Sequence, residues 1–315
     1  MSPTTQPHED AARIAAYAAA VRLDSNAARY RNDAAAVLSS ATYRDLASRE
    51  PSDAISRLMQ LMASADLAED ATFADMFDQA LSHLVRDYRN EYVFKNAIVS
   101  KIIFGRHRPT TASAILELPL GSSFADVAAF NGTSSVYEVK TDLDSFARLR
   151  SQVADYETRV EFVHLVVSDK RSAAAERQLP DRVGLMTLNR RGSLRVLREA
   201  QSNREGLRSD HIFDTLRQAE AERIVAANGV VLDDANALQR WEELRTAFAA
   251  LPVSAAHAGA VDAFKQRGSK IATLVTDARL PRSMRALAYA APLSGAAKQR
   301  LLTRLGMPVA LLRGT

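Results

Sequence analysis

The feature that most constrains this chain is a short apolar segment that carries two opposite charges, Ser135 to Lys140. Its sequence, Ser-Val-Tyr-Glu-Val-Lys, predicts a strand because β-branched and aromatic residues are frequent in it. Side chains of a strand alternate between two faces, so Glu138 and Lys140 share one face while Tyr137 and Val139 share the other. Burying two charges costs free energy unless they pair, bind a metal or take part in chemistry. We therefore expect a sheet with a chemical role at this strand.

A second acid lies in a similar apolar segment earlier in the chain. Asp126 is the only charged residue between Phe124 and Phe130. If the two strands are neighbours, Asp126, Glu138 and Lys140 converge at one edge of the sheet. Two carboxylates can hold Mg²⁺ or Mn²⁺, which prefer oxygen ligands and polarise a phosphate, while a lysine orients water or stabilises the transition state. The pattern indicates metal-dependent hydrolysis of a phosphodiester bond.

Asp126 and the run Glu138-Val139-Lys140 resemble the D, then E-X-K, signature of the PD-(D/E)XK, or restriction-endonuclease-like, nuclease superfamily. More closely, residues 90 to 170 resemble a poorly characterised bacterial family within it. The resemblance implies an α/β (α+β) fold with a mixed sheet flanked by helices. It also implies a Mg²⁺- or Mn²⁺-dependent nuclease or endonuclease acting on DNA rather than RNA. Asp126, Glu138 and the Val139 carbonyl are then expected to hold the metal, with Lys140 as a catalytic residue.

Three further positions match the superfamily. Gln152 and Tyr156 are similar to the QxxxY element of RecB-type members, which implies an assisting role for Gln152 and a nucleic-acid contact for Tyr156. Glu91 follows Asn90, a suitable N-cap, and matches the glutamate that assists metal or water binding on the first core helix. Otherwise Glu91 is only an acid favoured at a helix N-terminus. Glu117 is expected to approach Asp126 if their strands form a hairpin.

Basic residues near the predicted site are expected to contact the nucleic-acid backbone, because phosphate contacts position a strand without reading its bases. These residues are Arg106, Arg108, Arg148 and Arg150. A basic segment from Ala278 to Thr315, with a count of +7, could also neutralise phosphates. The alternative for this segment is a solvated helix face or a contact with the acidic N-terminal region, where residues 1 to 85 count to −5.

The chain divides into three predicted regions: a helical N-terminal region at 1–88, a nuclease-like core at 89–228 and a helical basic C-terminal region at 229–315. The terminal regions are expected to pack on the core or to mediate contact with a second copy or a partner protein. Periodicity predicts the following helices: Ala11–Leu23, Asn26–Ala47, Ser52–Ala65, Phe73–Asp87, Glu91–Phe104, Asp144–Glu157, His211–Ala227, Ala235–Ala250, and two or three shorter ones between Pro252 and Leu312.

Alternation and turn residues predict six strands, the second and third joined by the turn signal Asn131-Gly132. The predicted strands are Ala114–Leu120, Ser123–Asn131, Ser134–Thr141, Val160–Ser168, Val183–Leu188 and Ser193–Leu197. The core order is therefore a helix, three strands, a helix and a strand.

Several other classes are excluded. The chain has no cysteine, so a disulfide or a cysteine-ligated cluster is impossible, and its six histidines lack metal-ligand spacing. No phosphate-binding loop and no GxSxG motif is present. No apolar run reaches the ~20 residues that span a bilayer, and no secretory signal is visible, so we expect a cytoplasmic protein. The resemblance further implies a bacterial source and a role in defence or mobile-element biology. The alternatives are a non-catalytic nucleic-acid-binding or protein-interaction module on the same fold, and a helical scaffold.

Overall fold

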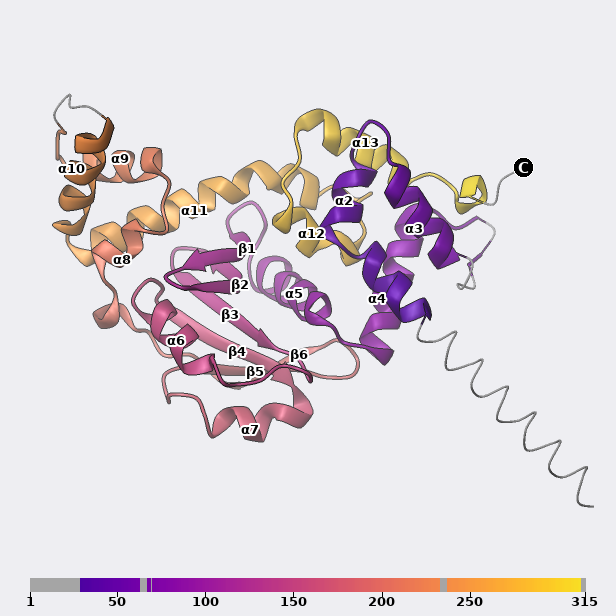
Figure 1. Cartoon of the computed structure of the whole chain (residues 1–315), viewed down its shortest axis with the longest axis horizontal. Helices are drawn as coiled ribbons and strands as arrows, with labels where there is room; N and C mark the ends of the chain where they lie inside the picture. The colour runs from indigo at the N-terminus through magenta and orange to yellow at the C-terminus, as the bar shows by residue number, and fades with distance from the viewer. Residues whose placement is uncertain (1–28, 63–66, 69, 233–236, 313–315) are drawn as a thin grey trace, which may run out of the picture.

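The computed structural model describes residues 29–62, 67–68, 70–232 and 237–312. Its centre is a six-stranded mixed sheet in the order β1-β2-β3-β4-β5-β6, which confirms the predicted mixed α/β fold with helical extensions (Figure 1). The strands are β1 (Ser113–Leu120), β2 (Ser123–Phe130), β3 (Ser134–Lys140), β4 (Phe162–Ser168), β5 (Gly184–Leu188) and β6 (Leu194–Arg198). Strands β3, β4 and β5 are parallel, and the remaining neighbours are antiparallel.

The hairpins form where the sequence places glycine. Gly121, Gly132 and Gly192 have φ of 68°, 71° and 73°, in the left-handed region that glycine enters at no steric cost. They lie in the turns that join β1 to β2, β2 to β3 and β5 to β6. All six predicted strands are present, and each observed end lies within two residues of the predicted one.

The N-terminal helices are residues 29–37, α2 (Ser40–Leu46), α3 (Ser52–Met62) and α4 (Phe73–Asp87). The single helix predicted over Asn26–Ala47 is wrong within the described part. The Ser39 side chain accepts a hydrogen bond from the Thr42 N–H and caps α2, which starts a new helix there. The helix predicted at Ala11–Leu23 lies outside the described residues. The prediction for α4 is confirmed, and Thr72 and Asp75 form its capping box.

Helix α5 (Glu91–Val99) begins after Asn90, whose side chain caps the Val93 N–H as predicted. It continues directly as a π-helix, η1 (Ser100–Arg106), one residue beyond the expected stop at Gly105. The π-helical turn is a departure from the sequence pattern, and such turns are frequent at functional sites.

The remaining helices follow the third strand. They are α6 (Leu149–Glu157), η2 (Asp169–Arg171), α7 (Ser172–Glu176), η3 (Arg204–Gly206), α8 (Ser209–Phe213), α9 (Gln218–Ala227), α10 (Ala237–Ala249), α11 (Val253–Val275), η4 (Arg282–Met284), α12 (Arg285–Ala290), α13 (Gly295–Leu305) and η5 (Val309–Leu312).

Three predictions for these helices are wrong. Asp144 does not cap α6, because its carboxylate accepts from the N–H and hydroxyl of Thr141 and closes a turn instead. The helix predicted over His211–Ala227 is broken into α8 and α9. The chain after Pro252 forms one helix of 23 residues, α11, before the short ones.

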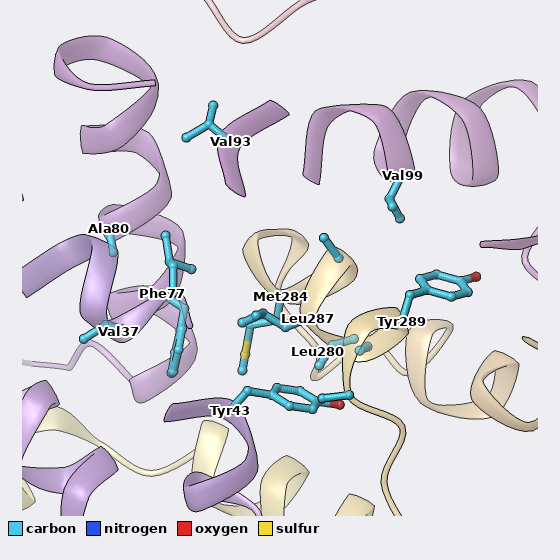
Figure 2. Close-up of a cluster of buried hydrophobic side chains, with 14 of the residues drawn as sticks. Val37, Tyr43, Phe77, Ala80, Val93, Val99, Leu280, Met284, Leu287 and Tyr289 are labelled. Carbon is cyan, nitrogen blue, oxygen red and sulfur yellow. The ribbon is translucent and has the colours of Figure 1, made fainter. Parts of the chain in front are cut away.

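Two hydrophobic cores lie on the two faces of the sheet. One joins α5 to helices from both terminal regions, so that Tyr43 and Phe77 pack in the same core as Met284 and Leu287 (Figure 2). The other joins the opposite face to α6 and to helices α8–α11. Within the described residues no single helix is long and apolar enough to cross a membrane, and only the bent pair Gln239–Ala249 and Val253–Val275, with a 118° angle, meets that test jointly.

The basic C-terminal segment is used inside the fold. Arg300 donates hydrogen bonds to the Ala47 and Ser48 carbonyls, and Arg304 donates to the Leu46 and Ser48 carbonyls. These carbonyls follow the last turn of α2 and need donors because no further helical turn supplies them. The two arginines therefore contact the N-terminal region, which is the alternative that the sequence left open for the basic segment.

Candidate active site

The site lies where β2 and β3 separate. Their ladder ends at the pair Val127 and Tyr137, beyond which β3 pairs only with β4 and β2 only with β1. The Val139 N–H, left without a β2 carbonyl, donates a 2.7 Å hydrogen bond to Oδ2 of Asp126. A side-chain carboxylate thus replaces a backbone acceptor, and the gap between the strands opens toward solvent. Asp126 is held at this gap by the sheet itself.

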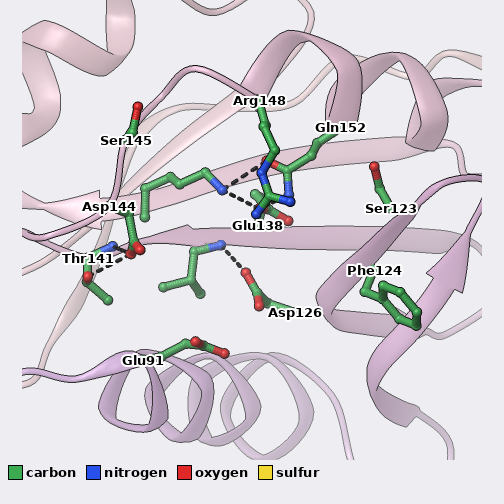
Figure 3. Close-up of polar contacts among 12 residues, drawn as sticks. Glu91, Ser123, Phe124, Asp126, Glu138, Thr141, Asp144, Ser145, Arg148 and Gln152 are labelled. Carbon is green, nitrogen blue, oxygen red and sulfur yellow. Dashed lines mark hydrogen bonds and ion pairs between the residues drawn. The ribbon is translucent and has the colours of Figure 1, made fainter.

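The face of β3 covered by α6 carries a buried polar network, which we call the α6 cluster: Glu138, Lys140, Gln152 and Tyr156. Oε1 of Glu138 accepts from the Lys140 ammonium at 2.7 Å and from the Gln152 amide at 2.6 Å, and Oε2 accepts from the Tyr156 hydroxyl at 2.8 Å. Lys140 also donates to the Gln152 carbonyl at 2.9 Å (Figure 3). Both oxygens of the 2 % exposed Glu138 carboxylate are therefore hydrogen-bonded within the protein.

The α5 side of the gap carries a second group, which we call the α5 cluster: Glu91, Lys95, Glu117 and Asp126. The Lys95 ammonium contacts the carboxylates of Glu91 and Glu117 and lies 3.3 Å from Oδ1 of Asp126. Oxygens of the three acids lie within 4.8 Å of one another and form a group that could hold a metal ion. In Figure 3, Asp126 lies between Glu138 and Glu91.

Glu117, a member of the α5 cluster, has an unusual backbone conformation. Its φ of 53° makes it the only non-glycine residue with positive φ in the described part of the chain. The β1–β2 register runs unchanged from the pair of Leu116 to that of Leu118, but Glu117 between them has no paired residue. Such a conformation costs of the order of 1 kcal/mol or more and is concentrated at functional sites. The expected approach of Glu117 to Asp126 across the hairpin is confirmed.

Both clusters line one cavity of about 340 Å³. Glu91, Glu117 and Asp126 line it from one side, and Glu138, Lys140 and Gln152 from the other, with the exposed Arg148 at its border. The predicted convergence of Asp126, Glu138, Lys140, Gln152 and Glu91 therefore occurs. The acids closest together, however, are Asp126, Glu91 and Glu117, and the predicted ligand role of Glu138 stays a prediction.

The electrostatics of Asp126 reflect this crowding of acids. Burial and the neighbouring Glu138 carboxylate raise its pKa from 3.8 to about 6, while Lys95 and the Val139 N–H act in the opposite direction. Burial is the larger cause of the raised pKa, because it disfavours the charged form of a carboxyl, and the Glu138 carboxylate adds to it.

Most of the residues that were expected to contact nucleic acid do not border the cavity. Tyr156 is fully buried, and its hydroxyl donates to Glu138 and to the Phe124 carbonyl, so its predicted contact with nucleic acid is wrong and it positions Glu138. Arg106 is the last residue of η1 and Arg108 follows it, roughly 20 Å of helix from Glu91. Arg150 lines a different hollow. Of the four arginines, Arg148 is the one that borders the site.

Lys95 is the residue that sequence reasoning missed. It lies four residues after Glu91, which is typical of an exposed ion pair on a helix surface. In the fold its side chain is 8 % exposed because the β1–β2 hairpin covers it. The position of Lys95 directly after the apolar run Tyr92-Val93-Phe94 of this helix was the available signal.

The fold and the site define a mixed α/β protein with an open three-carboxylate cluster beside a buried acid–lysine network. A family model described as bacteriophage P4 protein cII matches residues 85–286, well over half of the chain. The chain belongs to this family. No curated protein matches it. A solved structure of a protein of unknown function from Silicibacter pomeroyi is 18% identical, with 38% of this chain and 80% of that chain covered and a TM-score of 0.27, too low to inform the assignment.

Proposed function

We propose that this protein is a metal-dependent nuclease of the PD-(D/E)XK type that hydrolyses phosphodiester bonds in DNA. The observation that supports the proposal is the shared cavity, in which three carboxylates able to hold a cation face a buried glutamate–lysine pair. The bacteriophage family agrees with a role in mobile-element or defence biology.

The α5 cluster fits a hard divalent cation. Mg²⁺ and Mn²⁺ favour carboxylate oxygens and usually keep waters and phosphate oxygens as further ligands. Asp126, Glu91 and Glu117 supply three such carboxylates, two of them 56 % exposed and accessible from solvent. The Lys95 ammonium contacts the same oxygens, so a bound metal would take its place as the counter-ion. When bound, such a metal polarises the phosphate and lowers the pKa of a water molecule.

Lys140 is suited to act on the phosphate or the attacking water. An ammonium has three donors, and two of those of Lys140 are used by Glu138 and Gln152. The third is available to the cavity that Lys140 lines. Glu138 and Gln152 together fix the direction of the Lys140 ammonium. A donor held in place before the reaction stabilises charge that develops in the transition state.

The test is hydrolysis of linear, circular and single-stranded DNA with Mg²⁺ or Mn²⁺, with EDTA as a blank. Wild type is expected to cut at least one form. Asp126→Asn and Lys140→Ala are each expected to lower the rate by about 100-fold or more. The matched controls Asp181→Asn and Lys101→Ala remove the same charges at exposed positions and should cut like wild type. Equal rates for Lys140→Ala and Lys101→Ala would refute the role given to Lys140.

One observation favours a second function, a non-catalytic nucleic-acid-binding or protein-interaction module. Lys95 already contacts all three acids, and both oxygens of Glu138 are hydrogen-bonded, so these groups have partners without a metal. Such a module binds its partner equally in Mn²⁺ and in EDTA. Saturable Mn²⁺ binding by wild type that disappears in Asp126→Ala supports the nuclease instead.

A further inference from the structure

A second and larger hollow adjoins the cavity of the site. Its volume is about 1190 Å³, and it shares Glu91 and Asp144 with the smaller cavity. Its walls come from the junction of α4 and α5, the segments that follow β3 and β4, and the β5–β6 hairpin. These are the carboxyl ends of the three parallel strands, where ligands of open α/β sheets bind. The two hollows therefore adjoin at Glu91 and Asp144.

Three arginines gather at the outer part of this hollow: Arg86 at the end of α4, and Arg190 and Arg191 in the β5–β6 hairpin. Their two segments are in contact. A Cβ at Gly192 would lie 3.2 Å from a methyl of Val85, and the Arg89 guanidinium donates to the Leu188 carbonyl at 2.8 Å. All three arginines are exposed, and none has a carboxylate within ion-pair distance among the residues that the structure describes. We call them the arginine group.

In the described structure the acids of the hollow form no direct ion pair with this group, and four of the five contact other side chains. Asp142 pairs with Lys170 at 2.9 Å, and Glu91 pairs with Lys95. Asp87 lies 3.2 Å from the His83 ring, and Asp144 is bonded to Thr141. Asp169 is the one acid of the hollow for whose carboxylate the described structure gives no partner. The three guanidinium groups thus border an open depression without a direct ion pair in the described structure.

Two large apolar side chains are exposed in the same hollow. Tyr88 is 39% exposed and Leu143 is 80% exposed. Cationic groups interspersed with exposed aromatic side chains are typical of proteins that bind single-stranded nucleic acid, where each base stacks on a ring and the backbone meets the charges. In a duplex the bases are already stacked inside and cannot use such side chains.

We infer that this hollow binds an unpaired segment of DNA and leads it to the carboxylate site, so that the substrate is single-stranded. The inference rests on the proposed nuclease function. The arginine group neutralises phosphates outside the cavity, and Tyr88 stacks on a base between that group and Glu91. Sequence preference is not expected, because phosphate contacts and stacking are available to every base.

The test is the anisotropy of fluorescein-labelled oligo(dT) and of a blunt duplex of equal length, both measured in EDTA so that no hydrolysis occurs. Wild type is expected to bind oligo(dT) roughly tenfold more tightly than the duplex. Arg190→Ala/Arg191→Ala should bind oligo(dT) about tenfold more weakly. The negative slope of log K for binding against log salt concentration should become shallower by about 1.4. Tyr88→Ala should lose roughly tenfold.

The matched control is Arg49→Ala/Arg177→Ala, which removes two exposed charges far from the hollow and should stay within about twofold of wild type. Equal binding of duplex and oligo(dT), or equal losses in the two double variants, would overturn the inference. The separate hydrolysis assay distinguishes this failure from failure of the nuclease proposal. Binding to oligo(dT) that depends on Arg190 and Arg191, without any cutting in Mn²⁺, supports the hollow and rejects only the nuclease.

Discussion

The two clusters that meet at the gap between β2 and β3 use charge in opposite ways. In the α6 cluster one carboxylate meets one ammonium, the Gln152 amide bonds the same oxygen, and the Tyr156 hydroxyl bonds the other. In the α5 cluster three carboxylates surround one ammonium, and two of the acids are more than half exposed. The first arrangement is electrically balanced and fixed, and the second has an excess of negative charge that solvent can reach. The proposed nuclease would use both, one part that holds a donor still and one that can exchange its cation.

The largest expected effect tests the balance of the α6 cluster. Glu138→Ala leaves the Lys140 ammonium buried without its counter-ion, and we expect a loss of about 3–5 kcal/mol in the free energy of unfolding. Glu91→Ala removes an exposed acid from the α5 cluster and should change it by about 0.5 kcal/mol or less. Urea denaturation of the two variants measures both. Similar losses would show that the clusters do not differ as described.

The next effect is a pH dependence of the free energy of unfolding. It must be subtracted when the stabilities of cluster variants are compared at acidic pH. Burial lowers the pKa of His164, which stacks on Tyr137 of β3, from 6.5 to about 4. Between pH 6.5 and about 4, His164 therefore binds a proton in the unfolded chain but not in the folded chain. The stabilisation is present above pH 6.5 and is lost as the pH falls toward 4, by about 3 kcal/mol at most. Denaturation at a series of pH values should show this slope in wild type, and His164→Gln should flatten it.

A third prediction concerns the competition between the Lys95 ammonium and a metal ion for the three acids of the α5 cluster. Lys95→Met keeps the length of the side chain but removes the ammonium that competes for the three acids. We expect Mn²⁺ affinity to rise roughly tenfold, about 1.4 kcal/mol, by titration calorimetry. Lys140→Met is the control on the other side of the gap and should not raise the affinity. Weaker Mn²⁺ binding by Lys95→Met would mean that Lys95 organises the acids rather than competing for them.

The smallest effect concerns a single hydroxyl. Tyr156→Phe removes the donor to Glu138 and to the Phe124 carbonyl, and we expect a loss of about 1 kcal/mol in stability. Tyr289 is also buried, but its hydroxyl has no hydrogen-bond partner in the described structure, so Tyr289→Phe should be close to neutral. Thermal unfolding of both variants gives the comparison. A neutral Tyr156→Phe would contradict the positioning role of Tyr156.

The sequence predicted the sheet well because each strand carries its own signals. Alternating or continuous apolar residues define the strands, and glycines such as Gly132 define the turns. The predicted helix boundaries were wrong where a side chain forms a local hydrogen bond that the periodicity does not reveal. Ser39 starts a new helix, and Asp144 closes a turn rather than capping α6. The length of α11 follows from its contacts with β1 and with helices α8, α9 and α12, which no local pattern contains.

The site was predictable in part for the same reason. Asp126, Glu138 and Lys140 stand out as charges in apolar strands, and their spacing brings them to one gap. The involvement of Lys95 depends on the β1–β2 hairpin folding over α5, and that of Glu117 depends on a left-handed backbone at one residue. Both are consequences of tertiary packing. The arginine group likewise joins segments from positions 86 and 190–191 that only the fold brings together.

The core shared by the two terminal regions can form only after both regions have been synthesised. Tyr43 and Phe77 emerge from the ribosome early, but Met284 and Leu287, which pack in the same core, follow more than two hundred residues later. At the usual rate of about 5–20 residues per second, the first helices wait roughly 10 s or longer for their partners. Helix α5, which carries Glu91 and Lys95, rests on this core through Phe94 and Ile98. The acid cluster therefore acquires its final support only after the chain has been synthesised beyond Leu287.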